Sequence, residues 1–211
     1  MIDINLVKHF KNLPIQKYHT SSHLIEHGDV WPKVSRIFSP PFAQAFMQSR
    51  FIREMTDIFG EVKIADIHFH GWEDIYWRLV RPGANDVTTW HADRWFWDCH
   101  KEANLPEDYK RLKIWVPIHT VQGLNELQII PYSHRKEYDW IKEVRDGENK
   151  PKINQDIPDD EIYQPHFTQG QAVLFHEKLL HRGMPNKSDE TRVSIEFILL
   201  VKDSPRLEFD W

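Results

Sequence analysis

The chain has 211 residues and a mass of 25.4 kDa, which is enough for one well-buried core and short for two domains. Its 27 basic and 32 acidic residues give a formal charge of −5 without any basic run, which argues against nucleic acid or an anionic membrane as a partner and favours a small molecule. Because Cys99 is the only cysteine, no signal-peptide pattern opens the sequence and no apolar run approaches the roughly 20 residues of a membrane span, we expect a cytoplasmic protein.

Two apolar stripes with helical spacing come first in the chain. The first covers residues 4–13 and ends at Pro14. The second runs from Ser39 to Gly60 and predicts one long helix that covers one face of a sheet. We therefore expect a single domain, residues 1–211, in which residues 1–60 form a helical support for a core at 62–201.

Segments typical of β-strands follow, rich in aromatic and β-branched residues and bounded by turn residues. The polar stretch 101–110 between two of them is a candidate lid. Residues 136–169 are charged and broken by prolines, which predicts a long surface excursion that contributes to substrate specificity. The expected strands are 62–70, 75–81, 112–118, 127–131, 170–176 and 192–201.

His68 and His70 lie two residues apart in the first of these segments. In a strand they would point to one face and could bind a metal together. Because the sequence shows no matching carboxylate and no trailing arginine for them, we interpret them as exposed or hydrogen-bonded histidines and keep the pair as a rival metal site.

A stronger metal-binding pattern is formed by His91, Asp93 and a distal histidine. In an extended segment His91 and Asp93 point to the same side, and His181 follows ninety residues after His91. Two histidines and one carboxylate leave the opposite positions of Fe(II) open for a cosubstrate and dioxygen. His176, five residues before His181, competes for the role of third ligand.

Arg192 comes eleven residues after His181, at the start of the last expected strand. A guanidinium binds a carboxylate through two parallel hydrogen bonds, which a lysine cannot reproduce. Ser194 lies two residues further on the same strand face and is a possible helper. This pair predicts a binding site for a carboxylate cosubstrate.

Three aromatic residues, Trp95, Phe96 and Trp97, follow Asp93 directly. We expect at least one of these rings to lie over the metal and expect Trp95 and Trp97 to contact the substrate. Filling of the hydrophobic core is the alternative interpretation.

The ordered set His91, Asp93, His181 and Arg192, with residues 127–134 between, resembles the phytanoyl-CoA dioxygenase-like family over about residues 75–200. The resemblance implies a mainly β fold, a double-stranded β-helix or jelly roll. It also implies an enzyme that uses Fe(II), 2-oxoglutarate and dioxygen, hydroxylates a small-molecule metabolite and releases succinate and carbon dioxide. It favours His181 over His176, because the family's distal histidine precedes a glycine and lies eleven residues before the arginine.

The resemblance implies further residues of the site. A basic residue before Pro-Gly lines the cosubstrate pocket in the family, which matches Arg81 here, with Arg78 as a second candidate. The family's usual Pro-Gly-Ser-His corner has Tyr132 in place of the glycine, so we expect an ordinary negative φ at Tyr132 and a side chain that reaches toward the substrate.

Two other functional classes remain open for the chain. One is a cupin-like module that binds metal or a small ligand without turnover, for which Arg192 would be unnecessary. The other is a catalytically inactive relative, against which the intact set His91, Asp93 and His181 argues.

Overall fold

The fold is built on a five-stranded antiparallel sheet whose longest strands, β3 and β9, lie side by side at its centre. This computed structural model describes residues 36–83, 86–100, 106, 108–145, 147–168 and 170–202, so the helix expected at 4–13 lies outside the described residues. The strand order across the sheet is β1-β9-β3-β7. β2 also pairs with β9, toward the opposite end of that strand from β1. The strands are β1 (Val62–Ile64), β2 (Tyr76–Val80), β3 (Tyr109–His119), β7 (Val173–His176) and β9 (Arg192–Lys202).

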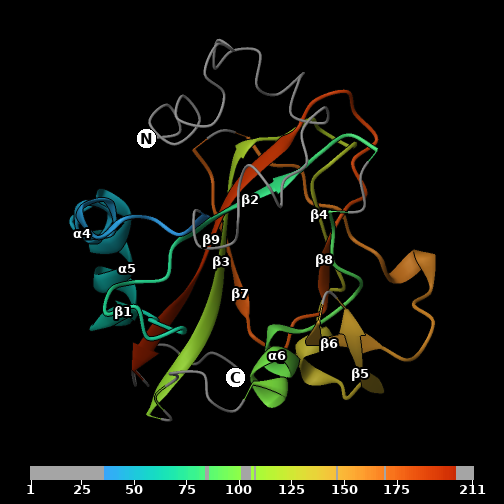
Figure 1. Ribbon diagram of the computed structural model, residues 1–211, viewed down its shortest axis with the longest axis horizontal. Coiled ribbons are helices and arrows are strands. Elements are labelled where there is room, and N and C mark those ends of the chain that lie inside the picture. Colours follow the sequence, from blue (N-terminus) through green and yellow to red (C-terminus); the bar gives the residue numbers. More distant parts are fainter. Residues whose placement is uncertain are drawn as a thin grey trace.

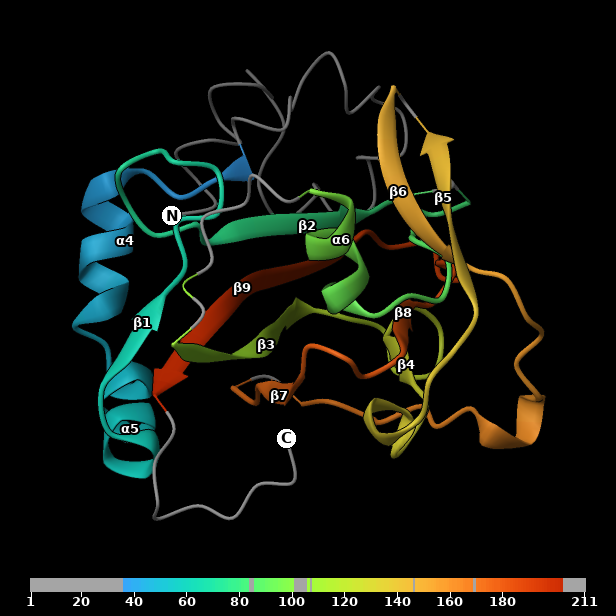
Figure 2. The ribbon, with the colours of Figure 1, turned by 90° about the horizontal axis from the view of Figure 1, so that it is seen from below.

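A second, smaller sheet faces the first one (Figure 1). It consists of β4 (Leu127–Ile129) and β8 (His181–Gly183), which pair antiparallel. The short helix α6 (Asp93–Cys99) lies below the gap between the sheets, beside the hairpin of β5 (Trp140–Arg145) and β6 (Glu148–Ile153) (Figures 1 and 2). The architecture is the predicted mainly β jelly roll, flanked by helices.

Two helices cover the face of the large sheet that is turned away from the small one (Figure 1). The prediction of one helix over residues 39–60 is wrong, because α4 (Pro40–Met47) and α5 (Arg50–Phe59) are separate. Ser49 adopts extended backbone angles and its side chain accepts a hydrogen bond from the amide of Ile52, so it begins α5 as an N-cap. Among the described residues, no helix is long and apolar enough to cross a membrane.

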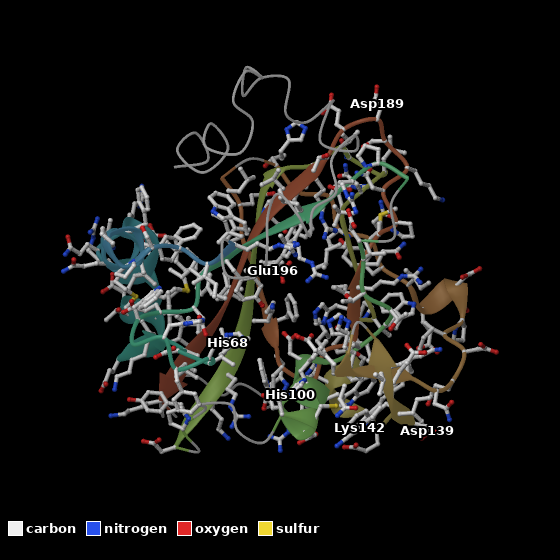
Figure 3. The ribbon with its side chains drawn as sticks, in the orientation of Figure 1. His68, His100, Asp139, Lys142, Asp189 and Glu196 are labelled. Carbon is white, nitrogen blue, oxygen red and sulfur yellow. The ribbon has the colours of Figure 1, made fainter. Side chains whose placement is uncertain are left out.

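Successive side chains of the long strands point to opposite faces of the large sheet. One face packs into the hydrophobic core, and the other, the interior face, lies between the two sheets. On β9, Val193, Ile195 and Phe197 join the apolar cluster beneath α4 and α5. Ser194 and Glu196 therefore face the other way, toward the small sheet, and Glu196 can be seen there in Figure 3. One strand thus contributes both to the hydrophobic core and to a polar interior face.

Two segments differ from the sequence-based expectation. Residues 136–169 do not form an irregular excursion throughout, because 140–153 fold into the β5-β6 hairpin. The strand expected at 62–70 ends at Ile64, so His68 and His70 lie in the loop before β2. Of the expected lid at 101–110, residues 101–105 and 107 lie outside the described part of the chain.

Candidate metal centre

His91, Asp93 and His181 come together between the two sheets. One nitrogen of each ring and one oxygen of the carboxylate lie within 4.8 Å of one another. The Nε2 atoms of His91 and His181 are 4.0 and 3.9 Å from Asp93 Oδ1, and all three side chains are buried. His176 lies outside this group, and its Nδ1 accepts a hydrogen bond from the amide of Lys178.

The segment 88–93 brings its two side chains together differently from the expected strand. His91 forms only an isolated β-bridge with His181, and the two residues exchange backbone hydrogen bonds of 3.2 and 3.0 Å. Asp93 is the first residue of α6, where a negative charge is favoured by the helix dipole. Bridge and helix start, rather than strand alternation, therefore aim both side chains at one point.

Both imidazoles are held in the form that binds a metal. The Nδ1–H groups of His91 and His181 donate to the carbonyls of Thr89 and Leu179, at 2.7 and 2.9 Å. Each Nε2 therefore carries the lone pair and points toward Asp93. Burial is the main cause that lowers the pKa of both rings, well below the ordinary value of 6.5 for His91. The rings are neutral at neutral pH and act as ligands without first losing a proton.

The donor set fits a first-row divalent ion. Donors that share such an ion at about 2.0–2.2 Å can be at most about 4.4 Å apart, and the Nε2–Oδ1 distances of 4.0 and 3.9 Å lie within this limit. Asp93 Oδ2 is buried without a hydrogen-bond partner, which is costly for a carboxylate unless an ion is present. Two histidines and one carboxylate are the donor set of non-heme Fe(II) sites with open positions.

Arg192 lies on the interior face of β9 with only 2% of its surface exposed. Its Nη1 donates weakly to the carbonyls of Asn125 and Glu126, at 3.4 and 3.3 Å, whereas its Nε has no hydrogen-bond partner. Burial lowers the pKa of Arg192 to about 10, which leaves it charged at neutral pH. The hydroxyl of Ser194, two residues along the same face, is also buried and unpaired. These donors suit a carboxylate ligand.

Lys113 is a residue of this face that the sequence-based reasoning missed. It is 5% exposed, and its Nζ lies 3.2 Å from Glu196 Oε2 and 3.9 Å from Asp93 Oδ2. Burial lowers its pKa, but the negative charge of Asp93 and Glu196 outweighs this and keeps the ammonium charged. Its signal in the sequence was a lysine inside an otherwise apolar strand, and such a lysine requires a buried partner.

The two candidate arginines of β2 and its end have different surroundings. Arg78 pairs with Ser194 in the register of β2 and β9, on the interior face, and its charge contributes to the lowered pKa values of His91 and Glu196. Arg81 instead donates through Nε and Nη2 to Asp86, at 2.8 and 2.9 Å. The guanidinium of Arg81 is thus engaged by a carboxylate of the next loop, whereas Arg78 lies on the interior face, and the expectation that Arg81 lines the cosubstrate pocket stays a prediction.

The aromatic run after Asp93 contributes one ring to the surroundings of the ligands. Phe96 contacts the His91 ring edge-on, with centroids 5.2 Å apart at 89°. Trp95 instead stacks on Trp140, at 5.5 Å and 10°, and Trp97 packs against a separate apolar cluster. The run forms a helix, so successive side chains point about 100° apart. Phe96 is the ring beside a candidate ligand, and the packing of Trp95 and Trp97 favours the alternative interpretation that they fill the hydrophobic core.

Tyr132 departs from its expectation in both respects. Its φ is +61°, in the left-handed region that glycine adopts readily and that was not expected for a tyrosine. The side chain is 68% exposed, and the guanidinium of Arg135 lies over its ring. The tyrosine points to solvent rather than into the site.

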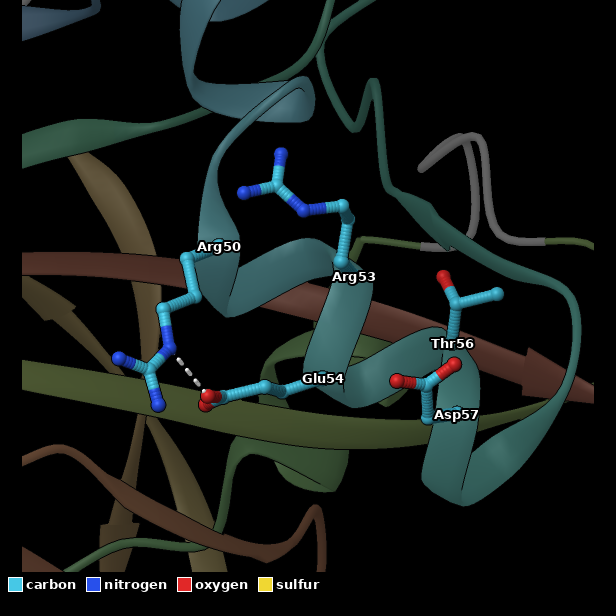
Figure 4. Close-up of a pocket in the computed structure, with 5 residues that line it drawn as sticks. All are labelled: Arg50, Arg53, Glu54, Thr56 and Asp57. Atoms are coloured by element: carbon cyan, nitrogen blue, oxygen red, sulfur yellow. Dashed lines mark hydrogen bonds and ion pairs between the residues drawn. The ribbon is translucent and has the colours of Figure 1, made fainter.

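A surface hollow on α5 lies apart from these residues (Figure 4). Its lining is the exposed face of that helix, where Arg50 donates to Glu54. Since the opposite face of α5 packs on the large sheet, the hollow lies outside the protein core and on the far side of the sheet from the candidate metal ligands.

Comparisons with known proteins place the chain in a family. The family model described as phytanoyl-CoA dioxygenase (PhyH) matches residues 17–194. No curated protein matches the sequence. Solved structures share the fold. One is EvdO2 from Micromonospora carbonacea var. aurantiaca, which is 16% identical to this chain with a TM-score of 0.58, and the match covers 83% of this chain and 72% of EvdO2. The apo form of the non-heme monooxygenase ThoJ has 14% identity, a TM-score of 0.58 and coverages of 91% and 68%.

Proposed function

Since this chain belongs to the phytanoyl-CoA dioxygenase family, we propose that His91, Asp93 and His181 hold its Fe(II) and that Arg192 and Ser194 bind the distal carboxylate of 2-oxoglutarate. The protein is an Fe(II)- and 2-oxoglutarate-dependent dioxygenase. The observation that carries the assignment of ligands is the buried convergence of two Nε2 atoms and one carboxylate oxygen, in which Asp93 Oδ2 accepts no hydrogen bond.

The residues of the chain have separate roles in this reaction. When bound, iron and 2-oxoglutarate supply a hydroxylation, in which one oxygen atom of dioxygen enters the substrate and the other enters succinate, with release of carbon dioxide. The neutral rings of His91 and His181 and the single carboxylate of Asp93 leave a net positive charge at Fe(II), which favours a bound anion. Lys113 lies close to Asp93 Oδ2 and restrains the orientation of that carboxylate.

The assignment of the cosubstrate rests on Arg192. A buried guanidinium with an unpaired Nε, next to the unpaired hydroxyl of Ser194, has donors available for one carboxylate. A metal-binding module without turnover has no use for such a pair. A structure of EvdO2 that is complexed with 2-oxoglutarate shares the fold of this chain, with 17% identity and a TM-score of 0.55, and supports this choice.

We infer that the primary substrate is a small-molecule metabolite, with Arg78 on the wall of its site or of the cosubstrate site. The single cysteine supports a reducing compartment, and we place the protein in the cytoplasm. A screen of candidate metabolites for stimulated succinate formation, with Fe(II) and 2-oxoglutarate present, would identify the substrate class.

The ligand assignment is tested by replacing each candidate histidine. His181→Ala should lose stoichiometric Fe(II) binding in anaerobic calorimetry, because two protein ligands remain for the ion. His176→Ala is the matched control and should bind Fe(II) like the wild type, since His176 lies outside the group. The reverse result would remove His181 from the metal site.

A further inference from the structure

A second group of possible metal ligands lies in the loop between β1 and β2. One nitrogen each of His68 and His70 and one oxygen of Asp74 lie within 4.8 Å of one another. Figure 3 shows His68 well apart from Glu196, which marks the interior face of the iron site. The group is therefore distinct from His91, Asp93 and His181.

Backbone hydrogen bonds fix the shape of this loop. The carboxylate of Asp66 accepts from the amides of His70 and Gly71, both at 2.8 Å. Asp74 Oδ2 accepts from the amides of Ile67 and His68, at 2.7 and 3.0 Å, and from His68 Nδ1 at 2.9 Å. The histidines are thus presented by an ordered turn.

The other oxygen of Asp74 is the feature that points to a ligand. Asp74 is 0% exposed, and its Oδ1 has no hydrogen-bond partner. His70 Nε2 lies 3.8 Å from this oxygen, which is too far for a hydrogen bond. An unpaired buried carboxylate oxygen is costly, and a cation between these two atoms would remove the cost.

The geometry and chemistry of the donors match a late first-row ion. Two donors at about 2.0–2.2 Å from a shared ion can be up to about 4.4 Å apart, which the 3.8 Å separation satisfies. Imidazole donors favour Zn²⁺, Cu²⁺ or Ni²⁺ over Mg²⁺ or Ca²⁺, which prefer oxygen. Trp72 packs beside the His70 ring, at 5.3 Å, and restrains it.

The exposure of the side chains leaves room for further ligands. The side chains of His68 and His70 are 59% and 28% exposed, whereas that of Asp74 is 0% exposed. The group therefore opens to solvent on the histidine side, where water can complete the coordination. We propose that His68, His70 and Asp74 form a second site, for Zn²⁺ or a similar divalent transition-metal ion, that ties the loop together independently of the iron centre.

The test counts zinc equivalents on the full-length chain. Titration with Zn²⁺ alone, by calorimetry and by metal analysis after dialysis, should show one equivalent fewer for His70→Ala than for the wild type. His181→Ala removes the iron site, so in that background the second site is measured alone, and adding His70→Ala should abolish both this equivalent and the rise of Tm that Zn²⁺ produces.

His100→Ala is the matched control, because His100 is also a histidine near the protein surface but lies at the end of α6, away from this loop (Figure 3). It should leave the zinc count unchanged. Since His70 is partly exposed, its replacement leaves the core intact, and circular dichroism would verify the fold. An equal count in the wild type and in His70→Ala, or a lost equivalent in His100→Ala instead, would overturn the second site.

Discussion

Gly183→Ala probes the position of Arg192 without touching a proposed ligand. A Cβ at Gly183 would lie 2.7 Å from Arg192 Nη1, 3.0 Å from Nη2 and 3.3 Å from Cζ. These distances are below van der Waals contact, so the guanidinium must move by several tenths of an ångström. Arg192 is 2% exposed and its guanidinium lies 6.0 Å from the ring of Trp115, so it has little room for that movement.

The movement should weaken 2-oxoglutarate binding more than it weakens the fold. Loss of one charge-assisted hydrogen bond corresponds to about 1.5–3 kcal/mol, or roughly 10- to 150-fold in Kd. Crowding of a packed site costs about 1–3 kcal/mol of unfolding free energy. Fe(II) binding should remain, because the added methyl group meets Arg192 and not a metal ligand.

The assay is a calorimetric titration of the anaerobic Fe(II) complex with 2-oxoglutarate. Arg192→Lys should show a similar loss, since it keeps the charge but not the two parallel hydrogen bonds. Gly147→Ala is the control for a glycine replacement as such, because its φ is +76° but nothing lies within 4 Å of the added Cβ. It should cost stability and leave the affinity unchanged. An affinity of Gly183→Ala within twofold of the wild type would show that Arg192 does not bind the cosubstrate.

Two further predictions concern residues outside the proposed ligand set. Because Trp95 is buried on Trp140, Trp95→Ala should lower the unfolding free energy by about 3–5 kcal/mol in denaturant titrations. The ratio of product to succinate should stay unchanged in the folded fraction. A changed ratio at wild-type stability would instead place the ring at the substrate. Burial and the neighbouring charge of His134 lower the pKa of His176 from 6.5 to about 4 in the folded chain. As the pH falls from 6.5 to 4, the unfolded chain binds a proton at this histidine and the folded chain does not, so the folded state loses stability in that pH window. His176→Asn should flatten this part of the stability profile, and an unchanged profile would contradict the assignment.

The sequence predicted the convergence of His91, Asp93 and His181 better than the local structure that presents them. Strand alternation suggested that His91 and Asp93 share a face, and they do meet, but through a single β-bridge and the first residue of a helix. A period of two cannot distinguish these arrangements over three residues. The same limitation affected Trp95 and Trp97, whose directions follow from helical geometry that begins at Asp93.

Side-chain partners that meet through folded loops or neighbouring strands explain most of what could not be predicted. The carboxylate that matches His68 and His70 is Asp74, which reaches them only because the loop folds back on itself. Arg81 pairs with Asp86 across a turn, and Lys113 meets Glu196 from a neighbouring strand. The residue composition and turn residues that predicted the strands carry no information on such pairs.

The paired backbone hydrogen bonds between His91 and His181 bear on the entropy of the proposed metal binding. If an ion had to bring together two ligands ninety residues apart in a flexible chain, its binding free energy would have to offset a loop-closure entropy cost on the order of 4 kcal/mol, from (3/2)RT ln n. Here the fold has closed that loop before any ion arrives. Affinity for a metal bound by this pair therefore depends on these two backbone hydrogen bonds, and a substitution that breaks them would weaken metal binding without altering a ligand.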